Sequence, residues 1–153
     1  MDVLLPRTLE EALDQKAAHP DAVCLAGGTD VMVEINFGRA RPGTIIDVSH
    51  LAELKGSRRE NGRWFLGAGE PYTQVIRKMA DVKPLVEASR SVGSPQIRNR
   101  GTVGGNLGTA SPAGDALPGL AACDTEVVLR RRPGRAHRRW DPFHQVAENT
   151  TTA

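Results

Sequence analysis

The pattern of apolar and polar positions predicts alternating helices and strands from the start of the chain. Thr8 and Glu11 have the spacing of a capping box, in which each side chain satisfies a free N–H of the first turn. Apolar residues then recur at helical spacing as far as His19-Pro20, where the proline ends the helix. The short apolar run 22–26 predicts a buried strand that stops at a pair of glycines.

Similar patterns continue as far as Leu129. Asn61-Gly62 lies between two short runs of strand character, and this dipeptide strongly favours a two-residue hairpin turn. Pro71 suits the first turn of a helix that ends near Met79. The other expected elements are helices over 31–37, 83–92 and 116–121, a brief turn over 51–55, and strands over 44–48 and 126–129.

The composition is that of an ordinary soluble protein, with 39% hydrophobic and 25% charged residues in a chain of 153. No apolar run approaches the ~18 residues of a membrane helix, and the N-terminus lacks the pattern of a secretory signal. Cys24 and Cys123 stand alone in the sequence. We therefore expect two buried, reduced thiols in a cytoplasmic protein, with neither a disulfide nor a metal pair.

The formal net charge of +2 is unevenly distributed. Residues 130–153 hold six arginines and two acids, so the preceding part of the chain has a slight excess of acids. A nucleic-acid-binding body is not expected, because its basic residues would cluster on a folded face. From Arg130 the sequence is polar with little periodicity, which predicts a flexible basic arm. Nucleic-acid binding by this arm is an alternative and predicts steeply salt-dependent binding.

The segment 93–115 contains six glycines and almost no bulky apolar side chain, so it cannot bury enough surface to pack by itself. Glycine allows unusual dihedral angles and close approach of the main chain to another group. Free N–H groups in a tight glycine-rich turn converge on an anion, most often a phosphate. A mobile surface loop is the alternative, but the segment mixes Pro95, Gln96, Arg98, Asn106 and Asp115 at distinct positions. We therefore predict a ligand-binding cradle.

A second glycine-rich turn, Gly27-Gly28-Thr29-Asp30, lies between the strand 22–26 and the helix after it. In such a turn the free N–H groups of the helix and the positive end of its dipole face outward, which suits a phosphate. The turn has neither the GxGxxG nor the GK[ST] pattern. Alternatively, Thr29 or Asp30 simply caps the helix.

Taken together, these segments closely resemble the FAD-binding, medium subunits of molybdenum hydroxylases of the carbon monoxide dehydrogenase and xanthine dehydrogenase type. The resemblance runs from about Pro6 to Leu129, and the intervening Gly67-Ala68-Gly69 strengthens it. The segments that carry it are Leu25-Ala26-Gly27-Gly28-Thr29-Asp30-Val31 and, about seventy residues later, Ser94-Pro95-Gln96-Ile97-Arg98-Asn99-Arg100-Gly101-Thr102-Val103-Gly104-Gly105-Asn106 and Ser111-Pro112-Ala113-Gly114-Asp115.

The resemblance implies an α+β fold with two FAD-binding subdomains and the cofactor extended between them. It divides the chain into an N-terminal α/β subdomain (1–55), the start of a second subdomain (56–129) and a divergent basic tail (130–153). Family members are much longer, so the second subdomain is expected to be incomplete. A truncated or frame-shifted product is our hypothesis for the abrupt change at Arg130.

The resemblance also implies which residues bind the cofactor. By position, one set would line the pyrophosphate and its neighbouring groups, a second set would form the other clamp, and Asp115 would bind a polar part of the cofactor. The first set is Leu25, Ala26, Gly27, Gly28, Thr29, Asp30 and Val31, and the second clamp is Thr102, Gly104, Gly105 and Asn106. Ser111 is also expected to bind the cofactor.

Related flavoprotein oxidases attach FAD through a histidine in the first glycine motif, where this chain has Thr29, so a non-covalent flavin is expected. In such enzymes a molybdopterin-binding large subunit oxidises the substrate. Electrons then pass through the iron–sulfur (2Fe–2S) centres of a small subunit to FAD and on to an external acceptor. The resemblance thus implies an oxidoreductase subunit without a catalytic acid or nucleophile of its own, since the flavin carries the chemistry. The alternatives are a stand-alone flavin oxidase or reductase and a non-catalytic remnant that docks on partner subunits.

Overall fold

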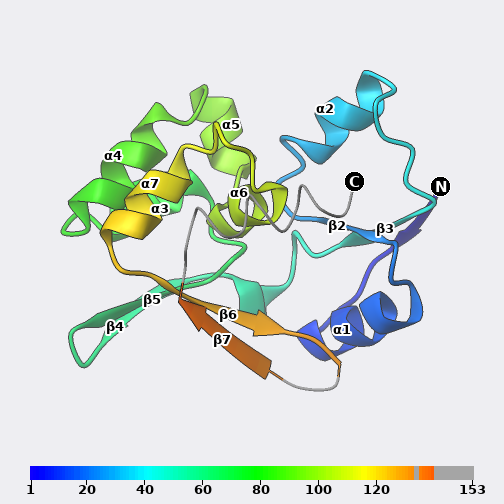
Figure 1. The fold of residues 1–153 in the computed structure, drawn as a ribbon, viewed down its shortest axis with the longest axis horizontal. Coiled ribbons are helices and arrows are strands. Elements are labelled where there is room, and N and C mark those ends of the chain that lie inside the picture. The colour runs from blue at the N-terminus through cyan, green and yellow to red at the C-terminus, as the bar shows by residue number, and fades with distance from the viewer. Residues whose placement is uncertain (133–134, 140–153) are drawn as a thin grey trace.

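The computed structural model describes residues 1–132 and 135–139, in which helices and strands alternate as far as β3 and the helices α3 to α7 later follow one another directly (Figure 1). Among these residues, none of the helices has the length and apolar character that crossing a membrane requires. The elements are β1 (Asp2–Leu4), α1 (Leu9–Ala18), β2 (Val23–Leu25), α2 (Val31–Asn36), β3 (Thr44–Asp47), η1 (Ala52–Leu54), β4 (Ser57–Glu60), β5 (Arg63–Leu66), α3 (Tyr72–Lys78), α4 (Lys83–Ser91), α5 (Pro95–Arg100), α6 (Val103–Thr109), α7 (Ala116–Ala122), β6 (Glu126–Arg130) and β7 (Arg135–Arg139).

A three-stranded parallel sheet in the order β1-β3-β2 organises the N-terminal part. The connections through α1 and α2 are the crossovers that parallel strands require, and Figure 1 shows these helices on opposite sides of the sheet. Ile45 and Ile46 of the central strand β3 are buried, with exposures of 2% and 0%. Parallel pairing places the carboxyl ends of β2 and β3 at the same edge of the sheet, where the first glycine turn begins.

The prediction that 22–26 forms a buried strand is correct for the strand and wrong for its burial. β2 lies at the edge of the sheet and pairs only with β3, so Val23 and Leu25 are half-buried and Cys24 is exposed. The expectation of two buried thiols therefore fails, because Cys123 is also partly exposed. Both cysteines are free.

Local sequence signals produced the expected geometry in two places. Thr8 Oγ1 accepts the N–H of Glu11 at 3.1 Å and caps α1. The reciprocal bond of the capping box is shifted by one residue, because the Glu11 carboxylate accepts the N–H of Arg7 at 2.7 Å. Asn61 and Gly62 have φ values of 50° and 78° and form the tight turn between the antiparallel strands β4 and β5.

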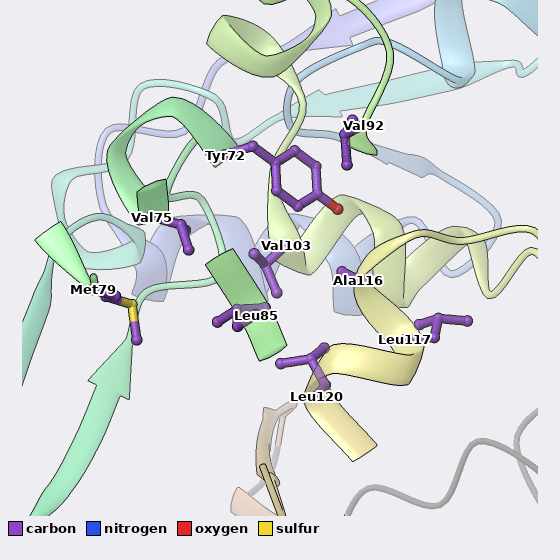
Figure 2. Packing of buried hydrophobic residues seen from close by; sticks show 9 residues of the cluster. All are labelled: Tyr72, Val75, Met79, Leu85, Val92, Val103, Ala116, Leu117 and Leu120. Carbon is purple, nitrogen blue, oxygen red and sulfur yellow. The ribbon is translucent and has the colours of Figure 1, made fainter. Parts of the chain in front are cut away.

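The main hydrophobic cluster lies among the helices α3, α4, α6 and α7 (Figure 2). Helix α7 packs closely on α4, since a Cβ at Gly119 would lie 2.9 Å from the carbonyl oxygen of Pro84. The cluster anchors α6 of the second glycine-rich segment against helices that precede and follow this segment in the chain. Its buried members are Tyr72, Val75, Met79, Leu85, Val92, Val103, Ala116, Leu117 and Leu120.

The expected flexible arm from Arg130 is wrong for residues 130–132 and 135–139. Arg130 ends β6, which pairs with β7 in an antiparallel hairpin. Arg130 and Arg132 form ion pairs with Glu10 of α1, and Arg132 also pairs with Asp14. Backbone pairing and acidic partners on α1 therefore order this region. The remainder of the predicted arm, residues 133–134 and 140–153, lies outside the described residues.

Candidate functional site

The first glycine turn connects β2 to α2 and leaves several N–H groups available. Gly28 has φ 77°, a conformation that glycine adopts without strain, and its carbonyl accepts the N–H of Met32 at 3.2 Å. The N–H groups of Gly27, Gly28, Thr29 and Asp30 donate no hydrogen bond to any residue that the structure describes. Asp30 stands at the N-cap position of α2, but among the described residues no side chain makes a capping hydrogen bond there, so the alternative that the Thr29 or Asp30 side chain caps the helix is wrong. The turn therefore keeps unused donors that suit an anion.

The second glycine-rich segment folds into the two short helices α5 and α6. Ser94 caps α5 through the N–H of Ile97, and Thr102 caps α6 through the N–H of Gly105 at 2.9 Å. The N–H of Gly104 donates to the carbonyl of Ala68 at 2.8 Å. The N–H groups of Gly104 and Gly105 are thus already bonded within the protein. These glycines provide close packing of the backbone, and the free donors belong to the first turn.

The structure brings the two glycine segments into direct contact. A Cβ at Gly27 would lie 2.1 Å from the carbonyl oxygen of Arg100, so only glycine fits where the first turn meets the end of α5. The Thr109 hydroxyl donates to Asp30 Oδ2 at 3.0 Å, which links the end of α6 to the first turn. Two segments that are about seventy residues apart in the sequence therefore form one site.

The loop Gly67-Ala68-Gly69 packs between Leu54, which follows the N-terminal sheet, and helix α6 of the second glycine segment. The N–H of Gly69 donates to the carbonyl of Leu54 at 2.7 Å, and a Cβ at Gly67 would lie 2.4 Å from the same oxygen. On the other side, a Cβ at Gly104 would lie 2.5 Å from the carbonyl oxygen of Ala68. The intervening glycines thus set the distance between Leu54 and α6.

Glu70 is a buried carboxylate, 3% exposed, that holds this loop in place. Its Oε1 accepts from Lys78 Nζ at 2.8 Å, and its Oε2 accepts the N–H of Gly56 at 2.6 Å. Burial alone would raise the pKa of Glu70. The hydrogen bonds from Lys78 and Gly56, together with the charges of Lys78 and Lys55, outweigh burial and lower the pKa below its ordinary value of 4.5. The carboxylate is therefore ionised at neutral pH.

A depression of about 130 Å³ lies where the two turns and this loop meet. Three of the residues predicted to bind cofactor, Ala26, Gly27 and Thr102, line it. The pairing of β2 with β3 places Ser49, which follows β3, beside them. Among its lining residues are four that sequence reasoning did not assign to the site: Ser49, Lys55, Asn99 and Arg100.

Three of these four positions carried a signal in the sequence. Asn99 and Arg100 belong to the segment that carries the family resemblance. Ser49 follows the predicted strand 44–48, and ligands of parallel sheets bind beyond the carboxyl ends of the strands. Lys55 had no comparable signal, because long-range bonds alone bring its loop to the site.

The predicted residues Asn106, Ser111 and Asp115 do not line the depression and form a neighbouring group. Ser111 Oγ accepts the N–H of Ala113 at 3.2 Å, and Asp115 Oδ1 accepts the hydroxyl of Ser91 at 3.1 Å. Asn106 Oδ1 is buried and has no hydrogen-bond partner in the part of the chain that the structure describes. A buried acceptor that lacks a partner is the kind of group that a bound ligand can satisfy.

Comparison with known proteins agrees with this arrangement. A family described as the FAD binding domain in molybdopterin dehydrogenase matches residues 1–153, which extends beyond the resemblance seen in the motifs. The nicotinate dehydrogenase FAD-subunit of Eubacterium barkeri is 43% identical over 130 residues, covering 81% of this chain and 44% of that protein. The carbon monoxide dehydrogenase medium chain of Hydrogenophaga pseudoflava is 32% identical over 118 residues, covering 75% of this chain and 41% of that one.

The solved structure of carbon monoxide dehydrogenase from Hydrogenophaga pseudoflava, lacking the Mo-pyranopterin moiety of its molybdenum cofactor, has the same fold. Its TM-score is 0.84 at 29% identity, and the match covers 90% of this chain and 49% of that one. The fold is that of an FAD-binding domain. The chain belongs to the family of FAD-binding domains of molybdopterin dehydrogenases. It spans less than half the length of the relatives described above.

Proposed function

We propose that this chain binds FAD non-covalently between its two glycine segments, as part of the FAD-binding subunit of a molybdenum-containing hydroxylase. The observation that carries the proposal comes from the first turn, where the N–H groups of the four successive residues 27–30 lack a hydrogen-bond partner among the described residues. This turn also contacts the second glycine segment, since Gly27 packs against Arg100. A pyrophosphate brings the acceptors that such donors need. Family membership identifies the cofactor as FAD.

The residues have different roles in this proposal. Residues 25–31 line the pyrophosphate, with the free N–H groups as donors. Thr102, Gly104 and Gly105 shape the opposing wall, because the N–H of Gly104 fixes α6 to the loop at Ala68 and the Thr102 hydroxyl caps α6 by accepting the N–H of Gly105. Asn106, Ser111 and Asp115 bind polar groups of the cofactor beyond the pyrophosphate, where Asn106 Oδ1 has an unused acceptor.

When bound, the flavin supplies the redox chemistry, and this chain contributes binding, orientation and the surrounding charges. We propose that electrons reach the flavin from iron–sulfur centres in a small partner subunit and leave to an external acceptor. A large partner subunit would hold the molybdenum cofactor and oxidise the substrate. The subdomain limits 1–55 and 56–129 and a cytoplasmic location belong to the same proposal. Its support is the match to subunits of such dehydrogenases.

Two glycines of α6 provide a matched test of cofactor binding. Gly104→Ala places a Cβ 2.5 Å from the Ala68 carbonyl oxygen, whereas a Cβ at Gly108 meets nothing within 4 Å. Because the clash must shift α6, we expect Gly104→Ala to weaken FAD binding by about tenfold or more. Gly108→Ala should retain FAD binding and add up to about 1 kcal/mol of stability through helix propensity. Titration followed by flavin fluorescence measures the affinities.

The wild-type result decides the proposal itself. A 153-residue chain that retains no flavin after desalting would contradict it, and would favour the alternative of a remnant that no longer binds FAD alone. Equal FAD affinity for Gly104→Ala and Gly108→Ala would show that α6 does not form the binding wall. Far-UV circular dichroism of both variants controls for loss of the fold.

A further inference from the structure

Two basic residues outside the predicted cofactor residues line the depression. Lys55 follows η1, and Arg100 is the last residue of α5. Neither side chain forms an ion pair or a hydrogen bond with any residue that the structure describes. Both share the depression with Gly27 of the first turn, whose N–H is also free. Two basic residues without an ion pair among the described residues, and a turn with unused N–H donors, thus line the same small space.

The backbone on both sides of Lys55 is fixed by hydrogen bonds. The carbonyl of Leu54 accepts from Gly69 at 2.7 Å, and Gly56 accepts from Gly67 at 2.8 Å. The N–H of Gly56 donates to the buried carboxylate of Glu70 at 2.6 Å. These bonds fix the backbone at Lys55, so its side chain starts from a defined position at the rim of the depression.

The charge of Lys55 is not used by the carboxylate next to it. Glu70 takes its direct ion pair from Lys78, at 2.8 Å, and its second oxygen is occupied by Gly56. Lys55 acts on Glu70 only through its charge, without a hydrogen bond. Its ammonium group is therefore left for another anion. Arg100 is fixed in a different way, because its carbonyl oxygen packs against Gly27.

We propose that Lys55 and Arg100 bind the diphosphate of FAD as side-chain cations that complete the neutral N–H donors of the first turn. This inference rests on the proposed function and specifies which part of the cofactor lies in the depression. A doubly charged diphosphate loses water when it enters such a site, and charge-assisted hydrogen bonds offset that loss about twice as well as neutral ones. The carboxylates Asp30 and Asp115 do not line the depression, so they leave its positive charge uncompensated there.

The test compares Lys55→Gln and Arg100→Gln with Lys83→Gln, which removes the same charge at the exposed start of α4. Three ligands are titrated: FAD, riboflavin and inorganic pyrophosphate. We expect the two site variants to bind FAD and pyrophosphate about 10- to 100-fold more weakly, with riboflavin affinity unchanged. Lys83→Gln should match the wild type for all three ligands. Urea unfolding checks that each variant is folded.

The outcomes separate this inference from the proposed function. Wild-type FAD affinity in Lys55→Gln and Arg100→Gln overturns the inference and leaves the proposed function intact. An equal loss of riboflavin affinity also overturns it, because riboflavin has no diphosphate. If the wild type binds pyrophosphate but not FAD, the proposed function fails, and weaker pyrophosphate binding by the site variants still supports the cation site. Binding of neither ligand by the wild type overturns both.

Discussion

At the scale of single residues, Tyr72 is an unusual member of the core. It is 2% exposed and packs in the main hydrophobic cluster, but its hydroxyl has no hydrogen-bond partner among the described residues (Figure 2). Burial, and then the charges of Asp115 and Asp30, raise the pKa of the Tyr72 phenol far above its ordinary value of 10.0. The hydroxyl therefore stays neutral, and its desolvation is not compensated by the protein.

Replacing Tyr72 by phenylalanine removes this hydroxyl and keeps the ring. We expect Tyr72→Phe to raise the free energy of unfolding by about 1 kcal/mol, because a buried polar group without a partner costs about 1–3 kcal/mol. Urea unfolding of the cofactor-free protein measures the change. Tyr72→Leu serves as the control and should be destabilising, since it leaves a cavity in the cluster. A loss of stability in Tyr72→Phe would mean that the hydroxyl has a partner, such as a buried water.

At the scale of elements, Glu70 connects parts of the chain that the hydrophobic cluster does not hold together. It lies immediately before α3, pairs with Lys78 at the end of that helix, and bonds Gly56 at the start of the β4–β5 hairpin. The loop it fixes contacts Leu54 on one side and Gly104 on the other. One buried carboxylate thus links α3 and the hairpin to the wall of the candidate site.

We expect Glu70→Gln to lower the free energy of unfolding by about 1–2 kcal/mol at pH 7. This is less than for a fully buried pair, because the Lys78 side chain is 47% exposed. The lowered pKa of Glu70 means that its contribution is complete above the unfolded value of 4.5 and is lost as the pH falls through the lower folded value. Wild type and variant should therefore converge in stability in acid below about pH 4.5, as followed by urea unfolding across pH. A difference that stays constant down to pH 2 would contradict this role of the carboxylate.

How much of these elements the sequence could reveal depends on the range of the interaction. Thr8 and Asn61-Gly62 act within a few residues, so α1 and the hairpin turn followed from local patterns. β1 was missed because it has only three residues and is defined by its pairing with β3, more than forty positions away. The exposure of Cys24 likewise depends on the strand order, which placed β2 at the edge of the sheet.

The candidate site likewise combines features set by local sequence with features set by long-range contacts. The two glycine segments were visible as sequence patterns, and the structure confirms that they lie together. Lys55 reaches the site through bonds from Glu70 and Gly69 to its neighbours, which no local pattern encodes. Sequence patterns therefore indicated the backbone donors of the candidate site and the segment that holds Arg100, whereas only the folded chain places Lys55 beside them.

At the scale of the whole molecule, electrostatic contacts join the two ends of the described chain. The β6–β7 hairpin lies beside α1 in Figure 1. Arg132 binds Asp14 through Nε at 2.7 Å and Glu10 through a terminal nitrogen at 2.7 Å, and Arg130 also pairs with Glu10. Two arginines of the basic C-terminal region are thus matched by acids of the first helix. The charge asymmetry of the sequence is partly neutralised in the fold.

These ion pairs are exposed to solvent, and this determines how Arg132→Gln should behave. The acidic partners Asp14 and Glu10 hold the pKa of Arg132 above its ordinary value, so the guanidinium stays charged across the working pH range. A change of pH therefore cannot reproduce the effect of removing this charge by mutation. We expect Arg132→Gln to lower the urea midpoint slightly at low ionic strength, because exposed pairs contribute little. In 1 M salt the Debye length falls to about 3 Å, so the difference from the wild type should largely disappear.

Arg131→Gln is the matched control, since Arg131 forms none of these ion pairs with α1. A deficit for Arg132→Gln that persists unchanged in 1 M salt would show that its contacts with α1 stabilise the hairpin by packing, and that charge is not the cause.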